Sequence, residues 1–189
     1  TVFGDLAVST LRELPGGRRP IESVVVPEAR PTWVRRAITR IGQEVEAGRQ
    51  AYVVCPRIEG EGGVLEVFDI LGLGPFRDFT VGYLHGRMPG EEKDLMMRRF
   101  AAGEIQVLVS TTVIEVGVDV PNATVMLIRE SELFGVSQLH QLRGRVGRGG
   151  HASLCLFHTL ASPLSDAGQR IAAVAATSDG FELAELDLE

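Results

Sequence analysis

The sequence predicts an α/β fold in which a parallel β-sheet is sandwiched between helices. Two patterns predict it. Short β-branched or apolar runs alternate with segments of helical periodicity, and several of these runs contain almost no polar residue. Strands that are apolar throughout are typical of a parallel sheet covered on both faces. The 189 residues, 44% of them hydrophobic, suffice for one domain with a full core.

The expected strands and helices follow one another along the chain. Strands are expected over 21–26, 51–55, 79–84, 105–109, 124–128 and 153–157. Helices are expected from Pro31 to just before Gly48, over 64–73, over 90–102 and from 137 to about 145. In the helix over 90–102, acidic residues occupy the first turn and arginines the last, as the helix dipole favours.

Three regions are expected. Residues 1–20 end in a run rich in Pro and Gly and read as a linker. Residues 21–161 form the α/β body, and residues 162–189 form a C-terminal helical hairpin broken at 177–180. Because the sequence starts with Thr1 and shows no signal-peptide pattern, we expect it to be a piece of a longer chain.

Composition excludes several classes of protein. No apolar run approaches the roughly 20 residues that span a bilayer, so no membrane partner is expected. The two cysteines, Cys55 and Cys155, form no CxxC pair, which argues against a metal site or a disulfide scaffold and suits a reducing cytoplasm. The net charge of −6 means that any nucleic-acid or phosphate site must be local.

The first segment that could carry chemistry covers residues 110–121. Ser110, Thr111 and Thr112 leave an apolar strand, and Gly117 and Asp119 follow. Ligands of open α/β sheets lie at the carboxyl ends of the strands, where hydroxyls and backbone N–H groups bind phosphate and an aspartate can hold a sugar hydroxyl. A Ser/Thr helix cap explains the hydroxyls equally well.

The second segment covers residues 138–149. On a helix, Gln141, Arg145 and Arg148 share one face, and apolar residues on the opposite face would anchor the helix to the sheet. Two guanidinium groups on one face suit phosphate binding. The alternative is that the arginines only complement the helix C-terminus, which explains their charge but not the repeated Gly-Arg spacing.

These motifs resemble those of superfamily 2 helicases. Residues 141–148, Gln-Leu-Arg-Gly-Arg-Val-Gly-Arg, resemble the sixth helicase motif, residues 110–121 the fifth, and residues 84–88 the loop that precedes the fifth. The stretches 4–6, 14–15, 134–141 and 179–185, with the Glu-rich loop after Cys55, resemble the RecG family of branch-migration helicases. The related transcription-repair coupling translocases match the start and tail less well.

The resemblance implies a second RecA-like motor domain of an ATP-dependent DNA helicase. In such helicases ATP and Mg²⁺ bind between two motor domains, and this domain supplies arginine fingers to the γ-phosphate. The matching fingers are Arg145 and Arg148, and Gln141 matches a position that couples nucleotide state to domain closure. Gly117 and Asp119 match residues near the nucleotide. The implied partner within the same chain is the first RecA-like domain.

The resemblance also implies contacts to branched duplex DNA at stalled forks and Holliday junctions, in repair and recombination. Thr111 matches a contact to the DNA backbone, and Thr112, His85 and Gly86 are expected beside it. His85 is expected to shape its loop rather than to act as an acid or base. The tail over 162–189 resembles the start of a helical-hairpin translocation element.

What the sequence lacks limits the isolated chain. It contains no Gly-x-x-x-x-Gly-Lys-Ser/Thr string and no DExH box, so we expect it neither to hydrolyse ATP nor to bind Mg²⁺ alone. The alternative function is a non-catalytic module that binds a nucleotide or a protein partner. Its dinucleotide-binding form needs a Gly-x-Gly-x-x-Gly turn after the first strand, and no glycine follows Val26 there.

Overall fold

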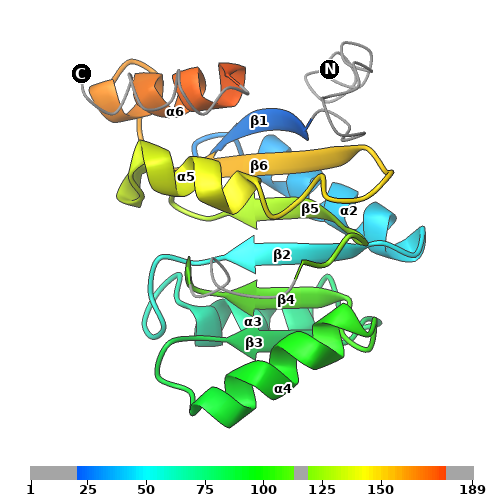
Figure 1. Cartoon of the computed structure of the whole chain (residues 1–189). Coiled ribbons are helices and arrows are strands. Elements are labelled where there is room, and N and C mark those ends of the chain that lie inside the picture. The colour runs from blue at the N-terminus through cyan, green and yellow to red at the C-terminus, as the bar shows by residue number, and fades with distance from the viewer. Residues whose placement is uncertain (1–20, 113–118, 178–189) are drawn as a thin grey trace.

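A computed structural model of the chain describes residues 21–112 and 119–177. In these residues the strands form one six-stranded sheet, ordered β1-β6-β5-β2-β4-β3, in which every neighbouring pair is parallel (Figure 1). The strands are β1 (Ile21–Pro27), β2 (Gln50–Val54), β3 (Val81–Leu84), β4 (Val107–Ser110), β5 (Ala123–Ile128) and β6 (Ser153–Thr159). The predicted parallel α/β architecture is therefore confirmed.

Helices cover both faces of the sheet (Figure 1). One face carries α2 (Pro31–Glu46) and α3 (Val64–Leu73). The other carries α4 (Gly90–Ala101), α5 (Val136–Arg143) and α6 (Asp166–Ala176). A short 3-10 helix, η2 (Ser131–Leu133), follows β5. No helix of the described residues has the length and apolar character that a membrane crossing requires.

The core has two layers because side chains alternate along each strand. On β2, Tyr52 and Val54 point into the layer under α4, α5 and α6, whereas Ala51 and Val53 point into the layer under α2 and α3. Every residue of β2, β4, β5 and β6 is buried. The apolar runs of the sequence are thus explained by strands that lie between two helical layers.

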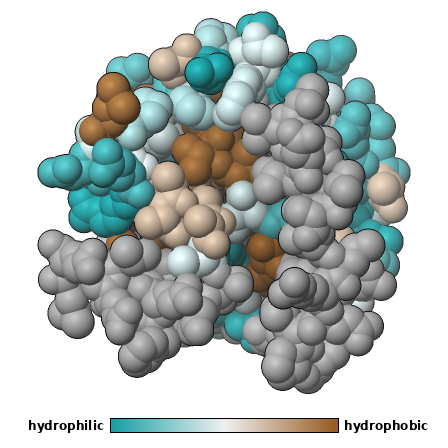
Figure 2. Space-filling view, turned by 90° about the horizontal axis from the view of Figure 1, so that it is seen from above, coloured by the Kyte–Doolittle hydropathy of each residue, from teal (hydrophilic) through white to brown (hydrophobic). Residues whose placement is uncertain are grey.

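The outermost strands are β1 and β3. The end of the molecule that carries β1 and α6 shows apolar side chains in the middle of the face, with polar side chains around part of their rim (Figure 2). Half-buried Ile21 and Val25 of β1 pack on the core beneath α6. β1 therefore extends the apolar core to this edge of the sheet.

Two expected strand starts are wrong by two residues, and hydrogen bonds explain both. β4 begins at Val107 rather than Ile105, because Gln106 binds the turn before it: its side-chain oxygen accepts from the Thr80 N–H and its amide donates to the Gly103 carbonyl. β3 begins at Val81 rather than Phe79, whose N–H closes a turn onto the Phe76 carbonyl. The expected linker over 1–20 and the second helix of the expected hairpin lie outside the described residues; its first expected helix corresponds to α6.

Two edges of the sheet matter for the site. Because all strands are parallel, their last residues share one edge, which we call the carboxyl edge; residues 28, 55, 85, 111, 129 and 160 leave the strands there. The opposite edge, where residues 122 and 152 lead into β5 and β6, we call the amino edge.

Candidate functional site

Two arginines and one aspartate converge beyond the end of α5. The Arg145 Nη1 lies 3.6 Å from Asp119 Oδ1, and the Arg148 Nη1 lies 3.5 Å from Asp119 Oδ2. The exposed fractions of the side chains are 14% for Arg145, 30% for Arg148 and 55% for Asp119. We call these three residues the arginine cluster. Two guanidinium groups with a partly exposed carboxylate leave an excess of positive charge at the surface.

Arg145 and Arg148 do not lie on a helix, although their spacing in the sequence had suggested that they do. α5 ends at Arg143, with Gly144 as its C-cap and Gly147 at a φ of 77°. Gly144 keeps a right-handed backbone, and Gly147 takes the left-handed conformation that glycine tolerates, so the chain turns away after the helix. The Arg148 Nε donates to the Gly144 carbonyl at 2.7 Å, so this arginine also caps the helix C-terminus. Arg145 and Arg148 are brought together by the turn rather than by helical periodicity.

The cluster lies at the amino edge, not at the carboxyl edge where the expectation placed it. Asp119 and Pro121 shortly precede β5, and a Cβ on Gly149 would lie 2.7 Å from the Pro121 carbonyl oxygen. Thr111 follows the last residue of β4 and lies at the opposite edge. The reason is topological: β4 and β5 are parallel, so the last residue of β4 and the first residue of β5 lie at opposite edges of the sheet.

Tyr52 of β2 lies under the arginine cluster, and sequence reasoning missed it. Its ring is 1% exposed and packs on Phe100 of α4, with the centroids 4.9 Å apart. Burial raises the pKa of Tyr52 to about 12, while the charges of Arg145 and Arg148 act against this rise. The phenol is therefore neutral and within electrostatic reach of both arginines. The sequence offered one signal for this residue: a single tyrosine within an otherwise apolar strand.

The third arginine of the motif, Arg143, has a structural role. It is 4% exposed, and its Nη1 donates to Ser23 Oγ at 3.1 Å and to the Val174 carbonyl at 2.9 Å. These bonds join α5 to β1 and α6. Burial lowers the pKa of Arg143, which has no carboxylate partner among the described residues. It does not contribute to the exposed positive charge of the cluster.

The residues expected to contact DNA gather at the carboxyl edge. Thr111 donates its N–H to the Leu84 carbonyl at 3.2 Å, which places it beside the start of the 85–88 loop. His85 shapes that loop, as expected: its Nδ1 accepts from the Arg87 N–H at 3.2 Å. Thr112 follows Thr111, and Gly86 is exposed within the loop. The hydroxyl of Ser110 is not presented there, because it donates to the Thr111 carbonyl at 2.8 Å.

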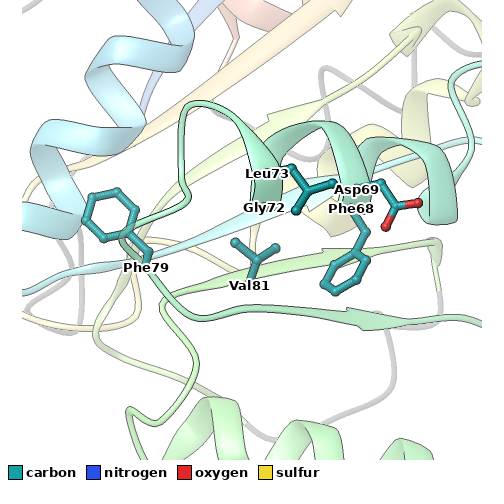
Figure 3. Close-up of a pocket in the computed structure, with 6 residues that line it drawn as sticks. All are labelled: Phe68, Asp69, Gly72, Leu73, Phe79 and Val81. Atoms are coloured by element: carbon teal, nitrogen blue, oxygen red, sulfur yellow. The ribbon is translucent and has the colours of Figure 1, made fainter.

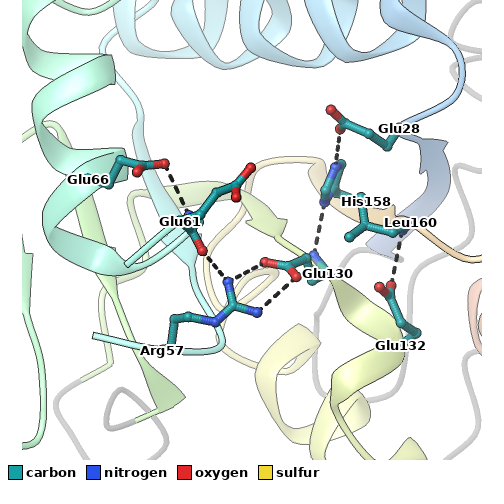
Figure 4. Close-up of polar contacts among 9 residues, drawn as sticks. Glu28, Arg57, Glu61, Glu66, Glu130, Glu132, His158 and Leu160 are labelled. Atoms are coloured by element: carbon teal, nitrogen blue, oxygen red, sulfur yellow. Dashed lines mark hydrogen bonds and ion pairs between the residues drawn. The ribbon is translucent and has the colours of Figure 1, made fainter. Parts of the chain in front are cut away.

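A network of hydrogen bonds and ion pairs joins the other segments that leave the strands at the carboxyl edge (Figure 4). The Arg57 guanidinium donates to both carboxylate oxygens of Glu130, at 2.8 and 2.9 Å. The Glu130 N–H donates to His158 Nδ1 at 2.9 Å, and His158 Nε2 binds the Glu28 carboxylate. The Arg57 hydrogen bond lowers the pKa of Glu130. Gly62 beside this pair has a φ of 77°, a backbone conformation that favours glycine, and a Cβ there would also push against the ends of both side chains.

The other expected site residues do not join the cluster. Gln141 lies exposed on α5, and no contact described by the structure joins its side chain to either arginine. Gly117 lies outside the described residues. Within the described ranges, no group of three or more His, Cys, Asp or Glu side chains could hold a metal ion.

A shallow pocket of about 210 Å³ lies between α3 and β3 (Figure 3). α3 covers the opposite face of the sheet from α5, so this pocket is separate from the arginine cluster. Its lining is largely apolar and holds no cationic side chain, so it does not suit a phosphate. The lining residues are Phe68, Asp69, Gly72, Leu73, Phe79 and Val81.

With this geometry in place, comparison with known proteins defines the class. Residues 32–150 match the helicase conserved C-terminal domain family, and because the match spans more than half of the sequence, the chain belongs to this family. The described sheet and its two helical layers are the RecA-like fold of that domain.

Within this class the chain is similar to RecG. It is 53% identical over its whole length to the ATP-dependent DNA helicase RecG of Mycobacterium leprae and 46% identical to that of Bacillus subtilis. It spans 27% and 28% of these two proteins. A structure of RecG bound to a three-way DNA junction superposes with a TM-score of 0.79 at 42% identity, over 93% of this chain and 23% of that one. The expected resemblance to the RecG family is confirmed.

The names of the relatives imply that they use ATP, and the described residues fit a phosphate group. Two guanidinium groups match the oxygens of a phosphate, because each presents several N–H donors in one plane. The described residues offer no cluster of carboxylates for Mg²⁺. No step is therefore assigned to a metal held by this chain.

Proposed function

We propose that this chain is the second motor domain of an ATP-dependent DNA helicase that remodels branched DNA, and that Arg145 and Arg148 act on the phosphates of an ATP held by a first motor domain. The observation that carries the proposal is the convergence of both guanidinium groups on one carboxylate at the surface. Two facts support the rest: the relatives are named ATP-dependent DNA helicases, and a RecG structure contains a three-way DNA junction.

The chemistry of the arginines follows from their charge and partial burial. ATP supplies a γ-phosphate whose oxygens gain negative charge as the phosphoryl group is transferred. Arg145 is 14% exposed, so it meets such a charge in an environment poorer in water than the bulk, where electrostatic stabilisation is stronger. An arginine finger contributes about 10³–10⁵ in rate in related phosphoryl-transfer enzymes.

The carboxyl edge is the proposed DNA-contacting surface. Thr111, Thr112, His85 and Gly86 lie at the ends of adjacent strands β3 and β4. Hydroxyl and backbone N–H groups bind phosphates of the DNA backbone without reading sequence, as a remodelling enzyme requires.

The proposal is tested in the full-length parent protein by DNA-stimulated ATP hydrolysis. Arg145→Ala and Arg148→Ala are each expected to lower kcat by at least about 10²-fold, because each removes charge from the phosphate. Arg40→Ala is the matched control: this arginine also forms an ion pair, with Glu44 at 3.1 Å, but on α2, on the other face of the sheet. Turnover within twofold of wild type in both finger variants would reject the proposal.

The isolated chain gives a second test. It is proposed neither to hydrolyse ATP nor to unwind a forked DNA, because it lacks the phosphate loop and the DExH box. Measurable ATP turnover by the purified 189-residue chain would contradict this.

A further inference from the structure

The proposed DNA-contacting surface lacks a permanent positive charge. Its expected members, Thr111, Thr112, His85 and Gly86, offer hydroxyl, imidazole and backbone N–H groups. Proteins that bind the DNA backbone neutralise its phosphates with arginine and lysine side chains. An arginine of the carboxyl edge would complete this surface.

Two arginines of this edge are already bound by carboxylates. Arg57 donates to both carboxylate oxygens of Glu130, and the Arg87 Nη1 lies 3.2 Å from Glu59 Oε1. Arg129, which directly follows β5, differs from both, because its guanidinium group has no ion pair or hydrogen bond among the described residues. Its Nε is buried, and the residue as a whole is half-buried. A guanidinium group in such a place is left unsatisfied until an anion binds it.

Backbone hydrogen bonds place Arg129 in one row with the expected DNA contacts. The Arg129 N–H donates to the Val54 carbonyl at 2.8 Å, and the Cys55 N–H donates to the Ser110 carbonyl at 2.7 Å. These bonds align the ends of β5, β2, β4 and β3, which are neighbours in that order. Adjacent strands lie about 4.8 Å apart, so Arg129 and Thr111 are about 10 Å apart along the row. The whole row spans about 14 Å, along which one DNA strand presents about four phosphates.

The charge of Arg129 is felt within this row. Burial raises the pKa of the Cys55 thiol to about 12, and the charge of Arg129 acts against this rise. The pKa of Glu130 is lowered mainly by its hydrogen bond from Arg57, and Arg129 lowers it further. The guanidinium group therefore lies near the ends of both β2 and β5, at the carboxyl edge.

We propose that Arg129 binds a phosphate of the DNA backbone and supplies the positive charge that the row of strand ends otherwise lacks. This rests on the proposed function, which places DNA on that row. A phosphate contact positions the protein on DNA without reading its sequence. In the free chain, a half-buried charge without a counterion costs stability. Arg129 is therefore expected to serve binding rather than folding.

The test measures binding of the full-length parent to forked DNA at a series of salt concentrations. Arg129→Gln is expected to weaken binding about 3- to 10-fold at low salt. The slope of log affinity against log salt should become shallower by about 0.7–0.9, the counterion release of one phosphate contact. Arg129→Lys keeps the charge and should restore the slope. Arg77→Gln is the matched control, because it removes an exposed arginine from the turn before β3, at the amino edge, and should leave the slope unchanged.

Urea unfolding of the 189-residue chain separates binding from a structural role. Arg129→Gln is expected to leave the urea midpoint unchanged or to raise it, because the variant removes an unpaired, half-buried charge. An unchanged salt slope in Arg129→Gln would overturn the proposal, and a lowered midpoint would then assign Arg129 to packing. Failure of the proposed function gives a different pattern: Thr111→Val and Arg129→Gln would both leave binding to forked DNA unchanged. If only the Arg129 contact is wrong, Thr111→Val still weakens binding.

Discussion

Glu130 has the φ angle of a left-handed residue, and this gives a prediction with a calculable size. At φ 50° and ψ 55°, it is the described non-glycine residue with a positive φ. Its carboxylate accepts two hydrogen bonds from Arg57. The left-handed conformation costs a residue with a Cβ about 1–2 kcal/mol, and Arg57 offsets part of that cost. Removing the carboxylate separates the two contributions.

Glu130→Ala and Glu130→Gly both remove the carboxylate and differ only in whether the strain of the left-handed backbone remains. Glu130→Ala loses the ion pair, about 1 kcal/mol for a partly exposed bidentate pair, and keeps the strain. Glu130→Gly loses the same pair but relieves the strain, because glycine adopts this conformation freely. We therefore expect the alanine variant to unfold about 1 kcal/mol more easily than wild type, and the glycine variant to be about 1 kcal/mol more stable than the alanine variant.

The assay is urea unfolding of the chain followed by circular dichroism, with the free energy extrapolated to water. Asp94, exposed within α4, supplies the matched control. In a helix the order reverses, and Asp94→Gly should be about 1 kcal/mol less stable than Asp94→Ala. If Glu130→Gly proved less stable than Glu130→Ala, as in the helix, the left-handed assignment would be refuted.

The other predictions concern one contact each. Arg57 lowers the pKa of Glu130 in the folded chain, so the ion pair stabilises the fold only while Glu130 is ionised. Arg57→Met should therefore lower the free energy of unfolding by its full amount at pH 7, and this loss should shrink as the pH falls below about 4. Urea unfolding at each pH measures it. Gly168→Ala should lower stability by about 2–3 kcal/mol, because the new Cβ would collide with the backbone carbonyl oxygen of Ser162; an unchanged urea midpoint would contradict this. Thr111→Val in the full-length parent should weaken binding to forked DNA about 3- to 10-fold with unchanged affinity for ATP, as titrations of each ligand would show.

The layered fold could be predicted because its signals are local. Helix α3 runs over 64–73, as expected, since its apolar spacing and the preceding glycines are readable within a few residues. The parallel sheet follows from apolar runs that need cover on both faces. The end of α5 was missed because periodicity was extended through Gly144, although a glycine is itself a stop signal.

The site was harder to predict because its partners are set by strand order. Tyr52 lies beneath the arginine cluster only because β2 is next to β5 in the sheet, which no local pattern reveals. The pairing of Arg57 with Glu130 has the same origin. The spacing in the sequence singled out Arg145 and Arg148, but only packing shows that Arg143 is buried against β1 and α6.

The central claim is that Arg145 and Arg148 act on the transferred phosphoryl group. The most direct measurement compares the affinity of the full-length parent for ADP alone and for ADP with aluminium fluoride, a mimic of that group in transfer. The account predicts that Arg145→Ala leaves the affinity for ADP within twofold of wild type and weakens the aluminium fluoride complex at least about 100-fold. Equal loss for both ligands, or no loss for either, would contradict it.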